Sequence, residues 1–316
     1  MAQPTNTFSS YDAIGNREDL INMIYDISPT ETPVLTALPR KKATATLHEW
    51  QTDALAAASA ANAVIEGDDA TTDASTATAR ITNRTQILDK VALVTGTQES
   101  VSKAGRKSEM AYQMEKRMKE LKRDIEAALT DNGASVAGND TTAREMAGFP
   151  AWLTTNTSFG GGAGADPVTI GSTTRTDGTQ RAFTEDLLLS VLESAYTNGG
   201  NPTLLVAGAF NIRKAGEFAG NSTRTVDAKE QKLYSGIKVY VSPYNQEIKL
   251  VPNRFSRSRD VLLIDPEYAA VAYLREFDTN DLAKTGDTTR KQILVECTLE
   301  VGNEVAHGGV FDLTTS

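Results

Sequence analysis

The sequence predicts an α+β fold in which a short N-terminal arm and a long projecting loop precede the main core. A long stretch rich in Ala, Ser and Thr, residues 44 to 94, has strand-like flanks. One long amphipathic helix follows near residues 105 to 129, and a mixed series of helices and short apolar strands completes the chain. An arm and a loop ahead of the core suit a protein that reaches onto its neighbours better than they suit an enzyme cleft.

Composition excludes several classes of protein. The chain has 316 residues, enough for two domains or for one core with large insertions. The formal net charge of −9 argues against a reader that wraps DNA with a basic face. No run approaches the roughly 18 apolar residues of a membrane span, and the first residues lack the features of a signal peptide. A single cysteine, Cys297, excludes an intrachain disulfide and fits a reducing cytoplasm.

The N-terminal part combines a helix with a hairpin. Asn16 is a plausible N-cap, and apolar residues at helical spacing predict a helix that ends at Ser28-Pro29. Residues 44 to 50 are strand-like, and residues 79 to 95 alternate well enough to form one long return strand. Residues 54 to 79 lack the large apolar side chains that would offset the entropy of ordering them, so we expect a mobile tip.

The central helix is the best-defined element of the sequence. Its apolar residues recur at intervals of four and three, and charged residues cover the remaining faces. Asn132-Gly133 is a natural stop signal. The apolar stripe consists of Met110, Met114, Met118, Leu121, Ile125 and Leu129.

Residues 131 to 180 are rich in loop-forming residues, and regular structure resumes at Thr184. We expect helices over residues 185 to 200, 209 to 219 and 266 to 277. Strands are expected at residues 203 to 208, 237 to 242, 247 to 252, 261 to 265 and 292 to 301. The last strand alternates perfectly, with Ile293, Val295, Cys297, Leu299 and Val301 on one face.

No motif supports a catalytic, cofactor or metal site. The run FGGGAGADP, residues 159 to 167, lacks the Lys-Ser/Thr and the flanking strand and helix of a phosphate-binding loop, so a flexible loop is the simpler interpretation. The two histidines, His48 and His307, have no metal-ligand spacing. Cys297 lies on the apolar face of a strand, where core packing explains it.

Two groups of residues are candidates for contacts outside the chain. Residues 101 to 130 hold eight basic and five acidic residues, and a solvated helix face is the default interpretation of this excess. The sharper hypothesis is that this face looks toward packaged DNA or a neighbour's acidic patch; its candidate residues are Lys116, Lys119, Lys122 and Arg123. The candidate inter-subunit contacts are His48, Trp50, Arg80, Arg84 and Lys90.

Several runs together resemble a family of tailed-bacteriophage major capsid proteins. They are REDLINMIYDISPTETPVLTALPRKKA with TLHEWQTDAL near the N-terminus, and IDPEYAAVAYLREF, LAKTGD and CTLEVGNEVAHGGV in the C-terminal third. The resemblance implies the Hong Kong 97-type capsid fold, also called the Johnson fold. It divides the chain into an N-terminal arm (1–43), an extended loop or E-loop (44–98), a peripheral domain with a long spine helix (99–180), an axial domain (181–285) and a return to the peripheral domain (286–316).

The resemblance also implies function and partners. We expect hexamers and pentamers of an icosahedral shell, assembled in the bacterial cytoplasm around double-stranded DNA that is not read by sequence. Separate scaffold and portal proteins, and possibly decoration proteins, would take part; no membrane, cofactor or enzymatic activity is expected. An encapsulin-like nanocompartment shell is the main alternative, and a soluble α/β enzyme that uses the turn at residues 203 to 210 is the third.

Overall fold

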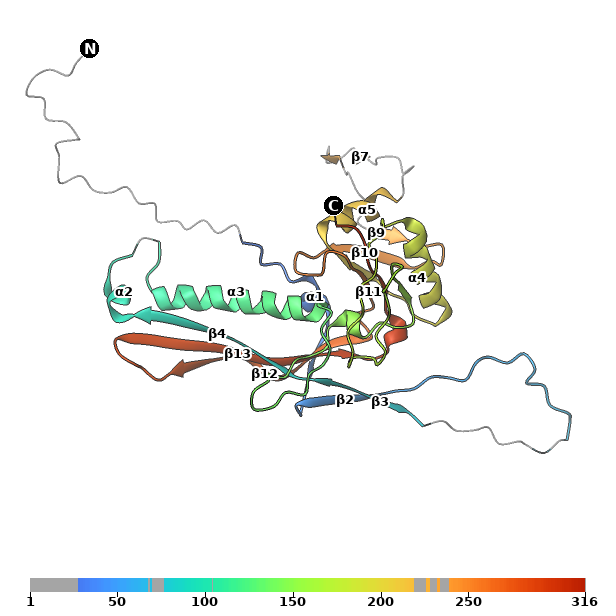
Figure 1. The fold of residues 1–316 in the computed structure, drawn as a ribbon, viewed down its shortest axis with the longest axis horizontal. Coiled ribbons are helices and arrows are strands. Elements are labelled where there is room, and N and C mark those ends of the chain that lie inside the picture. Colours follow the sequence, from blue (N-terminus) through green and yellow to red (C-terminus); the bar gives the residue numbers. More distant parts are fainter. Residues whose placement is uncertain are drawn as a thin grey trace, which may run out of the picture.

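The structure is a computed structural model that describes residues 28–67, 69, 77–103, 105–218, 226–227, 232–233 and 239–315. Figure 1 shows an elongated molecule with a long helix and sheet on one side and a compact body on the other. A thin hairpin extends from the base of the molecule. The helix predicted for residues 16 to 28 lies outside the described residues, apart from Ser28 at its end.

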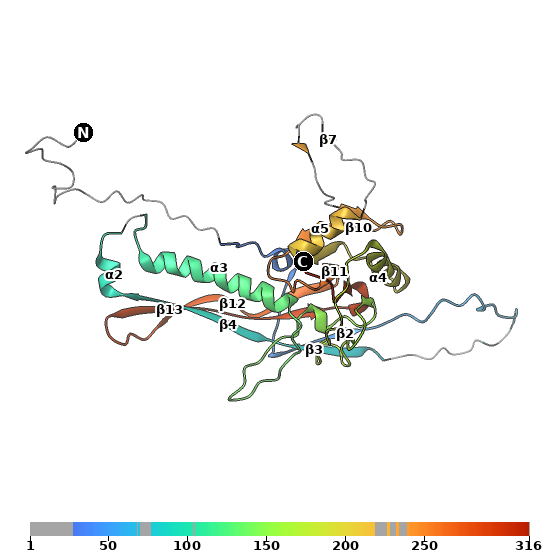
Figure 2. The same ribbon diagram turned by 45° about the horizontal axis from the view of Figure 1, so that its top comes forward.

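A four-stranded sheet runs along the long axis in the order β1-β12-β13-β4. β12 and β13 are long antiparallel partners, β4 pairs antiparallel with β13, and β1 pairs parallel with the start of β12. The helix α3 lies along one face of this sheet in both views (Figures 1 and 2). The elements are β1 (Arg40–Lys42), β4 (Gln86–Thr95), β12 (Ala269–Leu282), β13 (Thr288–Val301) and α3 (Glu109–Thr130).

The long helix α3 confirms the central prediction. Its N-cap is Ser108, whose hydroxyl accepts a hydrogen bond from the Ala111 N–H at 3.2 Å. The C-terminal half of the predicted stripe is fully buried at Leu121, Ile125 and Leu129, whereas Met118 is partly exposed. The predicted alternation of β13 is also confirmed, because all five of its inward residues are buried in the same core cluster as α3.

The compact body is a second sheet of six strands in the order β5-β14-β11-β6-β10-β9. A separate apolar core joins this sheet to α4 and α5. Three of the predicted strands, at 203–208, 247–252 and 261–265, appear within a residue of their expected limits, and the helix expected over 185–200 ends at Thr197. The elements are β5 (Thr157–Ser158), β6 (Leu204–Ala207), β9 (Val239–Val241), β10 (Glu247–Pro252), β11 (Val261–Ile264), β14 (Gly308–Val310), α4 (Glu185–Thr197) and α5 (Ala209–Glu217).

A two-stranded hairpin of β2 (Leu47–Thr52) and β3 (Ala79–Arg84) projects away from both sheets (Figure 1). The return strand predicted over residues 79 to 95 is interrupted at Thr85, after which β4 joins the long sheet. The Thr85 hydroxyl, which is buried, donates a hydrogen bond to Glu296 at 2.7 Å. This buried polar contact fixes the point at which the chain passes from the hairpin to the sheet.

The helix predicted for residues 266 to 277 is wrong, because most of that segment belongs to strand β12. Its alanines, Leu274 and Glu276 favour a helix when taken alone. In the fold, β13 pairs with residues 269 to 273 on one side and β1 pairs with residues 271 to 273 on the other. Pairing on both sides satisfies the backbone and buries both faces, so tertiary contacts override local propensity.

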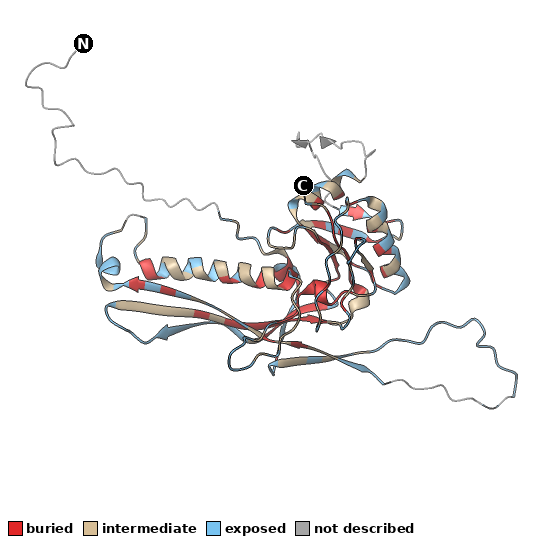
Figure 3. Cartoon of the chain, in the orientation of Figure 1, coloured by how far each residue is buried: buried red, intermediate tan, exposed pale blue. Residues whose placement is uncertain are grey.

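Short elements complete the fold. Figure 3 shows burial concentrated where the two sheets meet, with exposed residues along the hairpin. Cys297 is buried, as predicted. No helix among the described residues is long and apolar enough to cross a membrane. The short elements are α1 (Pro33–Ala37), α2 (Gly96–Ser100), β7 (Val226–Asp227), β8 (Lys232–Leu233) and the 3-10 turns at Phe149–Ala151 and Glu304–Ala306.

Candidate assembly surfaces

The root of the β2–β3 hairpin is braced by a charged contact. His48 Nε2 lies 2.9 Å from Glu300 Oε2, and Lys41 Nζ lies 2.7 Å from Glu300 Oε1. Burial disfavours ionisation of Glu300, but the hydrogen bonds from His48 and Lys41 outweigh it and hold its pKa below the usual range. Since Glu300 belongs to β13, this contact ties the hairpin to the centre of the long sheet.

The other predicted contact residues have different environments. The Trp50 ring lies 5.5 Å from the Trp152 ring and packs against the core. Lys90 Nζ lies 2.7 Å from Asp124 Oδ2 of α3. Arg80 is 69% exposed and Arg84 is half-buried, both on β3. The structure therefore gives His48, Trp50 and Lys90 roles within the chain, and their contacts with neighbours stay predictions.

The tip of the hairpin carries exposed apolar side chains. Every described residue from Asp53 to Gly67 is exposed. Leu55 is 99% exposed, Val64 84% and Ile65 78%. Large apolar side chains gathered on an exposed segment are a typical mark of an interaction site.

A second exposed apolar strip lies on β4. Alternate residues of this strand point to opposite faces, and Ala92 and Val94 are buried on the face toward α3. On the other face Ile87, Val91 and Leu93 are exposed. This outer strip is therefore free, within the described part of the chain, to receive an apolar partner.

The predicted basic residues lie on α3 as expected from its periodicity. Lys116, Lys119 and Lys122 are exposed, and the Lys119 ammonium pairs with Glu115 at 2.7 Å. Arg123 is half-buried, with its guanidinium 5.1 Å from the centre of the Phe255 ring. Three of the four residues are thus available to solvent, and Arg123 links the helix to the compact body.

Glu126 of α3 joins three segments at one carboxylate. Its Oε1 accepts hydrogen bonds from the Val34 N–H at 2.9 Å and from the Asn253 amide at 2.7 Å, and its Oε2 accepts from the Leu35 N–H at 2.8 Å. The Val34 and Leu35 N–H groups are the first ones that α1 leaves free, because Pro33 has no N–H and the N-cap Thr32 makes no side-chain hydrogen bond. Burial raises the Glu126 pKa, and the three hydrogen bonds oppose that rise.

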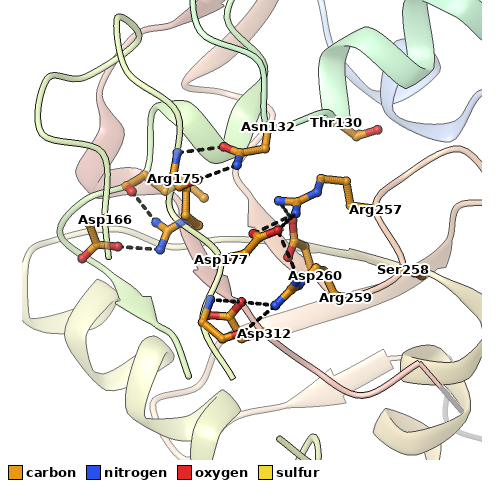
Figure 4. A network of polar contacts seen from close by, with 12 residues as sticks. Thr130, Asn132, Asp166, Arg175, Asp177, Arg257, Ser258, Arg259, Asp260 and Asp312 are labelled. Carbon is orange, nitrogen blue, oxygen red and sulfur yellow. Dashed lines mark hydrogen bonds and ion pairs between the residues drawn. The ribbon is translucent and has the colours of Figure 1, made fainter. Parts of the chain in front are cut away.

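A buried polar network holds the loop of residues 159 to 181 against the body (Figure 4). Asn132 and Arg175 exchange two hydrogen bonds, of 2.7 and 2.9 Å, between the Asn132 amide and the Arg175 backbone. The Arg175 guanidinium lies 2.6 Å from Asp166 Oδ1 and 3.5 Å from the centre of the Phe311 ring. Within the glycine-rich run Gly160 is closely packed, since a Cβ there would overlap the carbonyl oxygen of Thr179, whereas Gly161 is exposed with open space around it.

Asp312 is the second centre of this network. Its carboxylate accepts hydrogen bonds from the Gly160 N–H at 3.0 Å, from the Gly178 N–H at 2.8 Å and from Arg259 at 2.6 Å. Asp312 has a φ of 61°, in the left-handed region that Asp tolerates better than most residues. The C-terminal segment is therefore tied to both ends of the 159–181 loop.

Asp260 is an incompletely satisfied member of the network. Its Oδ2 accepts a hydrogen bond of 2.9 Å from Arg257, which also binds Asp177, while its buried Oδ1 has no hydrogen-bond partner among the described residues. Burial raises the Asp260 pKa to about 7 despite the nearby guanidinium of Arg257. Sequence reasoning missed Glu126 and Asp312, because their partners are scattered along the chain, and it missed Asp260 because the nearby Arg257 gives no sign that the carboxylate is buried.

The fold and these outward-facing elements define a shell subunit with the Hong Kong 97-type capsid fold. Solved structures support this class. The chain is similar to the capsid protein of cyanophage A-1(L), with a TM-score of 0.66, 13% identity and coverage of 98% of this chain and 99% of that one. It is also similar to an encapsulin of Synechococcus elongatus, with a TM-score of 0.58, 10% identity and coverage of 95% and 93%. At these identities the likeness shows the fold alone.

Sequence comparison selects between the two kinds of shell. The family model of the SU10 major capsid protein matches residues 3–314. A major capsid protein of Escherichia phage Phieco32 is 28% identical over 349 residues, which cover 98% of each chain. The chain belongs to the SU10 major capsid protein family, and it is the major capsid protein of a tailed phage. It is thus a structural protein of the virion capsid and assembles into multimeric shells.

Proposed function

We propose that the chain closes an icosahedral shell from rings of six and five copies, with the β2–β3 hairpin of each copy lying across a neighbour. The exposed tip carries this proposal, since Leu55, Val64 and Ile65 have no covering surface among the described residues. The outer strip of β4, Ile87, Val91 and Leu93, is a suitable acceptor on the neighbouring copy. The five domain limits predicted from the sequence are part of the same proposal.

The same proposed assembly has consequences for the inner face of the shell and for the partners of the chain. We infer that exposed lysines of α3 face packaged double-stranded DNA without reading its sequence, because Lys116, Lys119 and Lys122 offer charge on one helix. Arg123 contributes less, since it stacks on Phe255. Scaffold, portal and decoration proteins act with the chain during assembly in the host cytoplasm. The protein acts as a building block and not as an enzyme.

Limited proteolysis tests the hairpin contact. The tip of the free subunit should be cut rapidly, and assembly should protect it because a neighbour covers it. The variant Val64→Ser/Ile65→Ser should fold normally but yield fewer closed particles in electron micrographs. Asp53→Asn, at the polar start of the same tip, is the matched control. Equal protection of the tip in free subunits and in particles would contradict the proposal.

A further inference from the structure

The long sheet has one open edge with a step in it. β1 pairs only with residues 271 to 273 of β12. Beyond Tyr273, no strand among the described residues lies on that side of β12, which continues to Leu282. The open stretch of nine residues is about 30 Å long, and the step is about one strand spacing, roughly 4.8 Å deep. Figure 1 shows β12 and β13 running outward from the body as this long edge.

β1 and the open stretch of β12 carry opposite charges. β1 consists of Arg40, Lys41 and Lys42, all exposed. The open stretch of β12 presents Glu276, Asp278 and Asp281, also exposed; its one basic residue, Arg275, is paired with Glu296 of β13. A hollow of about 470 Å³ lies at the step itself, lined by Arg40, Lys41, Lys42, Tyr273, Leu274 and Glu276.

The edge of one copy is complementary to the same edge of a second copy that is rotated by 180°. A twofold axis perpendicular to the sheet would place β1 of a second copy in the recess beside β12 of the first, and the reverse. The two short β1 strands would then share one row between two β12 strands. Each basic triplet would face the acidic stretch of the other copy, and cross-strand pairs of opposite charge stabilise such neighbours.

We propose that this edge is a twofold contact between two copies of the chain, with β1 of each copy seated beside residues 278–282 of the other. The inference rests on the proposed shell function, because a lattice of rings needs contacts that join one ring to the next. A polyanion such as DNA would be attracted by β1 but repelled by the acidic stretch. A second copy of the chain offers an acidic stretch to β1 and a basic β1 to the acidic stretch.

The position of the contact follows from the regularity of β12. Its pairing with β13 is irregular between Tyr273 and Asp278 and regular from Asp278 to Leu282. Bulged segments resist further pairing, so the regular stretch is the better seat for a partner strand. Two local contacts must yield there: the Thr279 N–H is bonded to the Asp278 carboxylate at 2.9 Å, and Asp281 pairs with Lys291 at 2.9 Å. Both contacts are exposed, and an exposed ion pair such as Asp281–Lys291 contributes little to stability.

Charge reversal gives a test with an internal rescue. Arg40→Glu/Lys42→Glu and Asp278→Lys/Asp281→Lys each place like charges across the edge, so the yield of closed particles should fall by about tenfold or more. The combined fourfold variant is complementary again and should regain particles. Arg213→Glu/Lys214→Glu on α5 is the matched surface control, and thermal melting of free subunits verifies folding. The inference would be overturned if either double variant gave particles at the normal yield. It would also be overturned if the fourfold variant melted normally but gave no rescue.

Disulfide trapping reads the symmetry of the contact. In the variant Lys42→Cys/Asp278→Cys, a twofold contact joins the same two copies twice, so oxidised particles should give dimers on a denaturing gel. A ladder of higher oligomers would show a head-to-tail contact, and absence of crosslinks would show that the edges do not meet. Either of these results would refute the twofold edge and leave the proposed shell intact, whereas failure of the unmodified chain to form shells with its phage partners would refute the proposed function.

Discussion

Asp260 offers the sharpest test of the buried network, because its burial sets a pH dependence with a definite sign. Its pKa of about 7 lies well above the value of about 3.9 expected in the unfolded chain. Between these values the folded state binds the extra proton, so stability from this group is full below about pH 4 and is lost as the pH rises through 7. Three pKa units correspond to about 4 kcal/mol at most.

The variant Asp260→Asn should remove this dependence. The amide oxygen can accept the hydrogen bond from Arg257, and the amide nitrogen takes the place of the oxygen that lacks a partner. Relative to the unmodified chain, the free energy of unfolding of the variant should therefore rise with pH, by up to about 4 kcal/mol between pH 4 and pH 8.

Denaturant unfolding of free subunits at four or five pH values measures the difference between the two chains. Contributions from other carboxylates cancel in that difference. Asp53→Asn, which removes an exposed carboxylate, is the control. A difference between Asp260→Asn and the unmodified chain that stays constant from pH 4 to pH 8 would refute the reasoning.

Two further predictions concern other buried groups. Asp312→Ala should destabilise the free subunit by about 3 kcal/mol or more, since the Gly160 and Gly178 N–H groups lose their acceptor. Asp312→Asn should destabilise it less. Urea unfolding measures both losses, and a loss under about 1 kcal/mol for Asp312→Ala would count against the network. Burial raises the pKa of Cys297 to about 12, so the thiol should react with a thiol reagent only after unfolding; rapid reaction of the folded chain would contradict its burial.

The sequence was most informative where one face of an element is apolar over a long distance. The stripe of α3 and the alternation of β13 each repeat several times, so the period identifies both the element and its buried face. The short strand β6 and the helix α4 were also predicted, because clear turn residues flank them. The family resemblance supplied the capsid fold, which no periodicity contains.

The errors and omissions have physical causes. The segment 266–277 was predicted as a helix because its residues favour helix locally, whereas β1 and β13 impose a strand on it. β1 itself was not predicted, since Arg40–Lys42 carries no apolar pattern and exists only as a partner of β12. The network around Asp312 joins residues up to about 150 positions apart, and such contacts leave no local signal.

The junction at Glu126 limits where a shell can bend. One carboxylate ties α1 to the long helix and to the segment after β10, so these three parts are held together at one point. In the proposed shell, rings of five and six copies would meet their neighbours at different angles. The described residues of the hairpin tip are all exposed and lie outside this junction, so the tip is the part best placed to change its contacts with that angle. In the proposed shell the hairpin would take up that difference, and it lies at the far end of the molecule from the open tip of the long sheet (Figure 1).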